Sequence, residues 1–173
     1  MPDEVVLRCA LAVGAVLDRP LLRQLRAELR AAEAVTIASR ALARRDMSRR
    51  RLAARLEHAR MVREPRSRAL AALTDAGALD DARLARHRAA SLAERGWGNA
   101  AITARLEEEG IAETEARTAV EALAPEAERA LLLVPRFGDT KKAWAYLARR
   151  GFEPDTIDAV LSPLDDEGRG GLG

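Results

Sequence analysis

The side chains best suited to catalysis or metal binding are scattered along this sequence. The two histidines, His58 and His87, each fall among charged residues of helical pattern and are expected to be exposed. Cys9 is the single cysteine, whereas a metal site needs several ligands at short spacing. Asp80 and Asp81 could form a carboxylate pair for acid–base chemistry, but adjacent aspartates also suit a helix start. We predict no enzyme active site and no metal site.

Gly96-Trp97-Gly98 is the one short glycine motif that could suggest a phosphate-binding loop. It lacks the further glycine and the lysine of a phosphate-binding loop, and it joins two helical patterns. Trp97 could stack on a base of single-stranded nucleic acid. Aromatic residues make up only 3% of the chain, so we expect this ring to pack between structural units instead. Asn99 is then expected to cap the following helix, and no cofactor is predicted.

The remaining chemistry is electrostatic. Between positions 40 and 68 stand eleven arginines and three acids, a net formal charge of +8, whereas 105–128 carries −6. Such segregation suits a face for DNA phosphates or for an acidic patch of a protein, with a merely solvated helix surface as the ordinary alternative. Cations at a helix start also oppose the helix dipole. The candidate binding residues are Arg44, Arg45, Arg49, Arg50, Arg51, Arg55, Lys141, Lys142, Arg149 and Arg150.

Helices must position these residues. Alanine and leucine supply most of the apolar fraction of 48%, and charged residues at 32% suit amphipathic surface helices. Val5 to Val16 is apolar and partly β-branched, which leaves a short strand possible there. No apolar run approaches the roughly 18 residues of a membrane span, and the N-terminus shows no signal peptide. One cysteine fits a reducing compartment. We expect an all-α cytoplasmic protein.

One helical pattern occurs three times. Each copy has two apolar residues four positions apart, a third five positions later and a fourth nine positions beyond. These positions hold Leu52, Leu56, Met61 and Leu70, then Ile102, Leu106, Ile111 and Val120, then Ala143, Leu147, Phe152 and Leu161. Gly110 and Gly151 precede the third position, as a helix end favours, while Arg60 stands there in the first copy. The pattern predicts three helical repeats.

The repeats give the predicted organisation of the chain. We expect an elongated, curved, tandem array of three three-helix repeats after a helical lead-in, acting as a monomer. In repeat three, Leu131, Leu132, Val134 and Phe137 are expected on the first helix. The predicted segments are a lead-in at 1–33 (a possible short strand, then a helix), repeats at 34–79, 80–124 and 125–164, and a disordered tail at 165–173.

Two motifs resemble those of a known family. Leu79-Asp80-Asp81, Arg95-Gly96-Trp97-Gly98 and Gly110-Ile111 are similar to the central signature of the RecX family, and Tyr146-Leu147 with Arg149-Arg150-Gly151-Phe152 to its C-terminal signature. The resemblance covers roughly 34–161. It assigns structural roles to Leu79, Asp80, Asp81, Gly96, Trp97, Gly98, Gly110, Gly151 and Phe152.

The resemblance also implies a function. RecX proteins are tandem three-helix repeats that bind the filament of the RecA recombinase and generally inhibit its strand exchange and ATP hydrolysis. We therefore expect a non-enzymatic regulator of homologous recombination and the SOS response. A helical DNA-binding protein that acts through its basic face without RecA is the alternative, since three-helix units also resemble helix-turn-helix modules. A purely structural helical scaffold is a third possibility.

Overall fold

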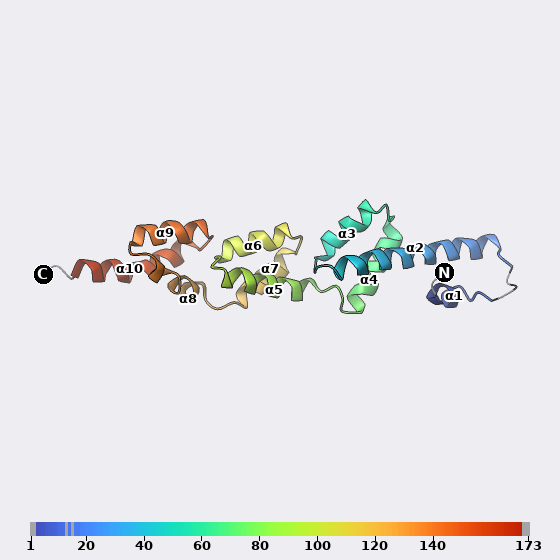
Figure 1. Ribbon diagram of the computed structural model, residues 1–173, viewed down its shortest axis with the longest axis horizontal. Coiled ribbons are helices and arrows are strands. Elements are labelled where there is room, and N and C mark those ends of the chain that lie inside the picture. Colours follow the sequence, from blue (N-terminus) through green and yellow to red (C-terminus); the bar gives the residue numbers. More distant parts are fainter. Residues whose placement is uncertain (1–2, 13, 15, 171–173) are drawn as a thin grey trace. The chain divides into compact units, whose positions relative to one another are not determined.

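The computed structural model describes residues 3–12, 14 and 16–170 (Figure 1). Within them the secondary structure is helical throughout, which confirms the predicted all-α class. The helices are α1 (Asp3–Arg8), α2 (Arg19–Leu42), α3 (Arg49–His58), α4 (Arg63–Asp75), α5 (Asp81–Glu94), α6 (Asn99–Glu108), α7 (Glu113–Glu121), α8 (Glu126–Leu131), the 3₁₀ helix η1 (Val134–Arg136), α9 (Thr140–Arg149) and α10 (Pro154–Gly170). The chain divides into two compact units, here unit 1 and unit 2, with the division between Asp80 and Asp81.

Repeat one fills most of unit 1. Helices α2, α3 and α4 pack around one apolar cluster, in which α2 contributes alanines such as Ala34 and Ala38. Leu52 and Leu56 of α3 are fully buried against them, because residues four apart share one face of a helix. Small side chains on α2 allow the backbones of α2 and α4 to approach closely. The predicted apolar positions of this repeat are therefore its core.

Val5 to Arg8 belong to helix α1, in the stretch where the sequence left a short strand open. Val5 and Cys9 are buried against α2, and their spacing of four residues suits a helix face, whereas an isolated strand would leave its backbone groups without partners. After it, the Asp18 carboxylate accepts a hydrogen bond from the Leu21 N–H at 2.8 Å and so begins α2. Helix α2 runs without a break through position 33, where the lead-in was predicted to end.

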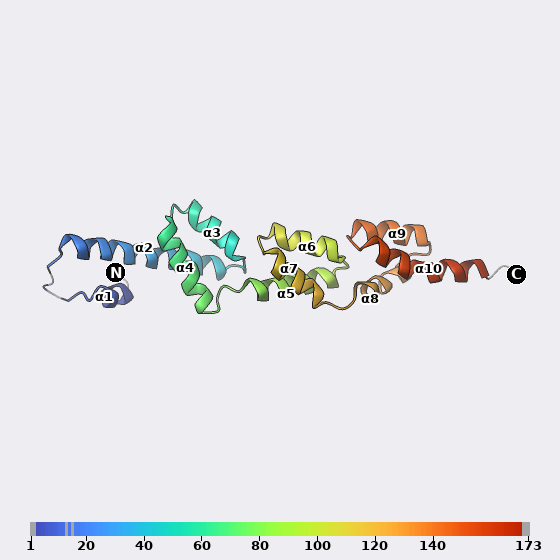
Figure 2. The same ribbon diagram turned by 180° about the vertical axis from the view of Figure 1, so that it is seen from behind.

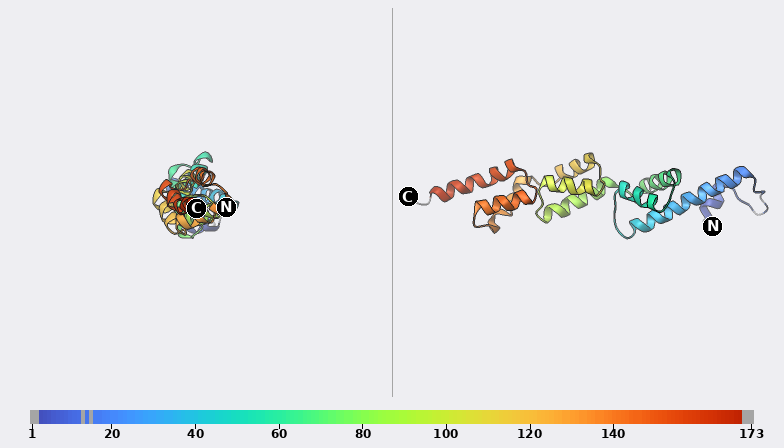
Figure 3. Two further views of the ribbon diagram at one scale, coloured as in Figure 1. Left: turned by 90° about the vertical axis from the view of Figure 1, so that its left-hand side faces the viewer. Right: turned by 90° about the horizontal axis from the view of Figure 1, so that it is seen from above.

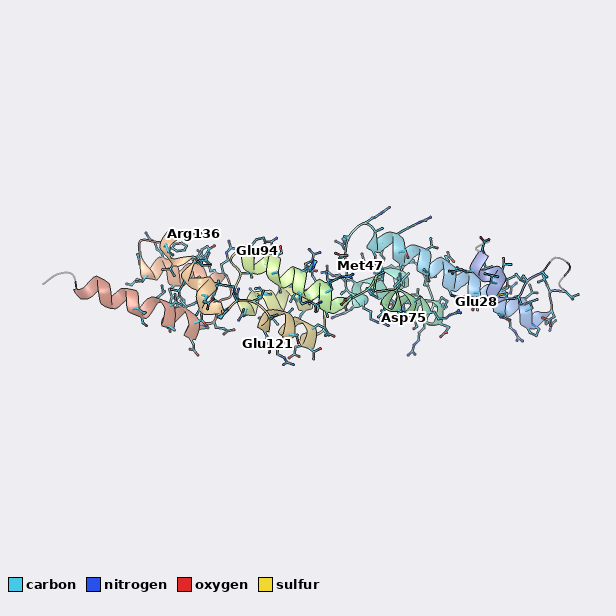
Figure 4. The ribbon with its side chains drawn as sticks, turned by 90° about the horizontal axis from the view of Figure 1, so that it is seen from below. Glu28, Met47, Asp75, Glu94, Glu121 and Arg136 are labelled. Atoms are coloured by element: carbon cyan, nitrogen blue, oxygen red, sulfur yellow. The ribbon has the colours of Figure 1, made fainter. Side chains whose placement is uncertain are left out.

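An ion-pair cluster joins three helices of unit 1. Arg68 of α4 donates to both carboxylate oxygens of Glu28 on α2, at 2.7 and 2.9 Å, and Arg8 of α1 donates to the same group at 3.4 Å. The hydrogen bond from Arg68 lowers the pKa of Glu28 below its usual value of 4.5. Figure 4 shows Glu28 and Met47 at two separate places along unit 1.

This cluster should make the stability of unit 1 depend on pH. Because the pKa of Glu28 is lowered by folding, its stabilisation is complete above about pH 4.5 and is lost as the pH falls further. The variant Glu28→Gln should cost about 1 kcal/mol at pH 7, and its deficit should be smaller at pH 3. Urea unfolding at both pH values measures this, with Glu33→Gln, from an exposed pair with Arg30, as control. A deficit that is the same at both values would contradict the assignment.

Unit 2 holds repeats two and three. Helices α5, α6 and α7 pack against one another (Figure 2). They share a cluster that includes the fully buried Ile102 and Leu106. Helices α8, α9 and α10 share a second cluster around Leu147 and Ile157, with α9 and α10 lying side by side (Figure 3). Each repeat thus buries its own apolar core, as the recurring pattern predicted.

The second helix of every repeat ends in the same turn. The residue before the third apolar position is left-handed in all three, with φ of +59° at Arg60, +81° at Gly110 and +76° at Gly151. The following N–H then donates five residues back, for example from Met61 to the Leu56 carbonyl at 3.0 Å. Matching positions in the sequence are therefore matching positions in space, and Arg60 adopts a conformation that normally favours glycine.

Replacing Arg60 by glycine should stabilise unit 1 by about 1 kcal/mol. A side chain in the left-handed region costs roughly 1–2 kcal/mol, of which the greater freedom of glycine in the unfolded chain cancels a part. Denaturant unfolding followed by circular dichroism measures the change. The control is Arg60→Ala, which keeps the strained Cβ and should give no gain. Equal midpoints for the two variants would refute the strain.

One expectation for the C-terminal part is wrong. Repeat three does not begin with one long helix, because Pro135 lacks an N–H and breaks the pattern into α8 and η1. Leu131 and Leu132 consequently lie exposed, whereas Val134 is buried and Phe137 half-buried. Helix α10 continues past position 165 to Gly170. The predicted disorder of 165–173 stays a prediction. Residues 171–173 lie outside the described part.

Candidate partner-binding surface

The arginines of unit 1 gather where α2 gives way to α3. Arg44 and Arg45 lie exposed in the connection between the helices, and Ser48 begins α3 by accepting a hydrogen bond from the Arg51 N–H at 3.3 Å. The first turn of α3 holds three arginines and no acid, an arrangement that the helix dipole disfavours. We call these six residues the basic surface: Arg44, Arg45, Arg49, Arg50, Arg51 and Arg55.

Members of the basic surface differ in their surroundings. Arg50 and Arg55 are exposed, Arg51 is half-buried, and Arg49 donates to the hydroxyl oxygen of Thr74 on α4 at 2.9 Å. Arg45, Arg51 and Arg55 line an open groove of about 540 Å³ together with His58. His58 was expected only to be exposed, because its spacing from other residues gives no sign of a groove beside it.

The cations of repeat three lie in two different kinds of surroundings. Lys141 and Lys142 are exposed at the start of α9, where the Asp139 carboxylate accepts a hydrogen bond from the Lys141 N–H at 2.8 Å. Arg149 is also exposed. Arg150 is half-buried and donates to a carbonyl of repeat two, that of Arg95, at 3.3 Å. Its position makes it part of the contact between repeats two and three.

Trp97 is at the centre of that contact. The Arg105 guanidinium lies 3.8 Å from the centre of its ring and the Arg150 guanidinium 4.6 Å from it. The Arg150 group also lies 5.2 Å from the ring of Tyr146. This geometry favours packing between repeats, and not base stacking, as the role of Trp97. The neighbouring Gly96 has the side chain of Leu133 close by.

Two signature glycines allow the backbones of the repeats to touch. The Gly98 N–H donates to the Arg150 carbonyl at 2.9 Å, and the Ala100 N–H donates to the Gly151 carbonyl at 3.2 Å. A Cβ on Gly98 would lie 2.2 Å from the Gly151 oxygen, and one on Gly151 would lie 2.5 Å from the Cβ of Ala101. Only glycine fits at either place. Phe152, next in the chain, is buried in the core of repeat three.

A buried carboxylate also lies at the contact between repeats two and three, which we call the junction. Glu126 of α8 is 8% exposed, and its oxygens accept from the Asn99 N–H at 2.5 Å and from the Glu153 N–H at 3.2 Å. Asn99 was expected to cap α6, but Gly98 occupies the cap position and Glu126 supplies the acceptor. The Asn99 side chain accepts from Arg129, which also donates to the Trp97 carbonyl at 2.9 Å.

Charge within the junction is balanced locally. Burial lowers the pKa of Arg129, and the attraction of the Glu126 carboxylate acts against that change. Arg129 remains protonated at neutral pH, because guanidinium groups titrate far above it. Sequence reasoning missed this pair, since Pro125-Glu126 resembles any helix start and carries no sign that the carboxylate is buried.

The remaining signature residues form the link into repeat two. Leu79 is buried in the core of repeat one, and its N–H donates to the Leu73 carbonyl at 3.0 Å. Asp80 precedes α5 and Asp81 begins it, a place where negative charge is favourable. Among the residues that the structure describes, no group of three or more His, Cys, Asp or Glu could hold a metal ion. No helix in that same part is long and apolar enough to cross a membrane.

Comparison with known proteins bears on the fold. No family model and no curated protein sequence matches this chain. Among solved structures, the crystal structure of RecX from Lactobacillus salivarius matches with a TM-score of 0.73 and 19% identity, over 79% of this chain and 97% of that one. A crystal structure of regulatory protein RecX matches with a TM-score of 0.77 and 17% identity, over 92% of this chain and 85% of that one. The chain therefore has the fold of the RecX crystal structures, as its two sequence motifs predicted.

Proposed function

We propose that this chain is a non-enzymatic regulator that binds the RecA filament and inhibits its ATP hydrolysis and strand exchange. The observation that carries the proposal is the similarity of the fold to two RecX crystal structures over most of the chain. Gly98 and Gly151 allow close backbone contact, Trp97 lies between two arginines, and Leu79 closes the first core. One of the two similar structures is named a regulatory protein.

The proposed mechanism requires no cofactor. Successive repeats would contact neighbouring protomers along the groove of the filament, with the basic surface facing DNA phosphates or acidic loops of the recombinase. Occupation of the groove would compete with a second DNA strand and favour disassembly. Such a regulator works only if it binds one filament state more tightly than another, and its effect is limited by that difference.

ATP hydrolysis by RecA on single-stranded DNA tests the proposal. Titration of this chain should lower the rate, and reversal of the basic surface should raise the half-inhibitory concentration about tenfold or more, because several charge contacts become repulsive. The test variant converts three of its exposed arginines to glutamate: Arg44, Arg50 and Arg55. The control variant makes the same change of charge with three exposed arginines of α2: Arg19, Arg23 and Arg26.

Two results would contradict the proposal. The first is an unchanged rate of hydrolysis at every concentration of the chain. The second is tight binding to DNA without RecA, with affinity falling at a log–log salt slope of roughly 4 to 5, as about six phosphate contacts would give. That second result would instead support a DNA-binding protein that acts through the basic surface.

A further inference from the structure

The groove of unit 1 combines two kinds of surface. Its lining combines apolar side chains, here called the floor, with three arginines and one histidine, here called the rim, and it contains no acidic residue. The apolar part consists of Ile37, Met47, Ala54 and Ala59, and the polar part of Arg45, Arg51, Arg55 and His58. A volume of about 540 Å³ is within the range of sites that bury a ligand group, roughly 300–1,000 Å³.

The matching part of repeat two holds an aromatic ring where the groove of repeat one has Met47. The register of the repeats pairs Met47 with Trp97, Arg55 with Arg105 and His58 with Glu108. In repeat two the guanidinium of Arg105 lies over the Trp97 ring at 3.8 Å. In repeat one a methionine stands in place of the tryptophan, and the volume beside it is open. An aromatic ring that enters the groove would meet Arg55 as Trp97 meets Arg105.

The rim selects the charge of the residues around that ring. Arginine guanidinium groups bind carboxylates through paired hydrogen bonds, and clusters of them recognise acidic motifs. DNA phosphates would satisfy the same arginines, but they would leave the apolar floor unused. An aromatic anchor between acidic residues uses both parts of the groove, which favours a peptide over a nucleic acid.

We propose that the groove between α2 and α3 binds an acidic segment of a protein partner, with one aromatic side chain on the apolar floor and carboxylates at Arg45 and Arg55. The inference uses part of the basic surface named in the proposed function, but it does not require RecA as the partner. A chain without effect on RecA could still bind such a segment, so the two proposals fail in different experiments.

Fluorescence anisotropy with the full chain tests the inference. The probe is a labelled peptide with one phenylalanine between runs of aspartate and glutamate, and a matched peptide carries serine in place of the phenylalanine. The first peptide should bind at least tenfold more tightly. The variant Ala54→Trp fills the floor without changing any charge and should weaken binding of the first peptide at least tenfold. Its control is Ala104→Trp, the exposed equivalent in repeat two, which should have no effect.

A charge variant and a nucleic acid probe complete the test. Arg55→Glu should weaken peptide binding tenfold or more, whereas Arg63→Glu, an equal change of charge at an exposed position outside the groove lining, should change it little. Binding of a labelled thymidine oligonucleotide should be the same in Ala54→Trp and the unmodified chain. Equal affinity for the two peptides, or an Ala54→Trp variant that loses the oligonucleotide and keeps the peptide, would overturn the inference.

Discussion

Replacing Gly98 by alanine should destabilise unit 2 by about 3 kcal/mol. The added Cβ would lie 2.2 Å from the Gly151 oxygen and 2.3 Å from its carbonyl carbon. These are backbone atoms, so no side chain can rotate away to make room. Relief requires repeats two and three to move apart, which breaks the hydrogen bonds from Gly98 to Arg150 and from Ala100 to Gly151.

Thermal and urea unfolding measure this effect. In a Trp144→Phe background, the fluorescence of Trp97 follows the contact between repeats two and three, because the guanidinium groups of Arg105 and Arg150 lie close to its ring. The matched control is Gly138→Ala, where an added Cβ meets nothing within 4 Å. The control should change stability by no more than about 0.5 kcal/mol. If the two variants unfold at the same midpoint, the repeats are not in the close contact described.

Replacing Glu126 by alanine should also cost unit 2 about 3 kcal/mol. The change leaves the N–H groups of Asn99 and Glu153 without their acceptor, and it removes the negative charge beside the partly buried Arg129. Each buried donor left unsatisfied costs about 1–3 kcal/mol. Glu126→Gln keeps one acceptor oxygen and should lose less.

Comparing Glu126→Ala with Glu128→Ala distinguishes the loss of a buried acceptor from the loss of a negative charge. Glu128 lies on the same short helix but is exposed, so Glu128→Ala removes an equal charge without removing a buried acceptor. We expect that variant to remain within about 0.5 kcal/mol of the unmodified chain in the same unfolding experiments. Equal losses from the two alanine variants would show that Glu126 acts through net charge alone.

The repeats could be predicted because the buried face of a helix requires apolar residues at regular spacing in the sequence. Leu52 and Leu56 recur as Ile102 and Leu106 since each pair must face its own core, and the turn after them fixes the next buried residue. The register even placed Arg60 at the position where the other repeats use glycine, and its φ of +59° confirms the match. These features depend on neighbours along the chain.

Features that depend on distant residues could not be predicted in this way. Glu126 is buried because Asn99 and Glu153 bring their N–H groups to it, and neither spacing nor residue type reveals that. Arg150 looked like a surface cation, since its stacking on Trp97 arises from the packing of two repeats. The β-branched residues from Val5 onward left a short strand possible, but the residues up to Arg8 form helix α1.

Binding of this chain to preformed RecA filaments is the most direct test of its proposed function. Labelled chain should co-sediment with filaments on single-stranded DNA at physiological salt, and binding to the same DNA without RecA should be weaker by tenfold or more. Equal binding to the bare DNA, or no binding to the filament, would contradict the proposal that this RecX-like fold acts on the recombinase.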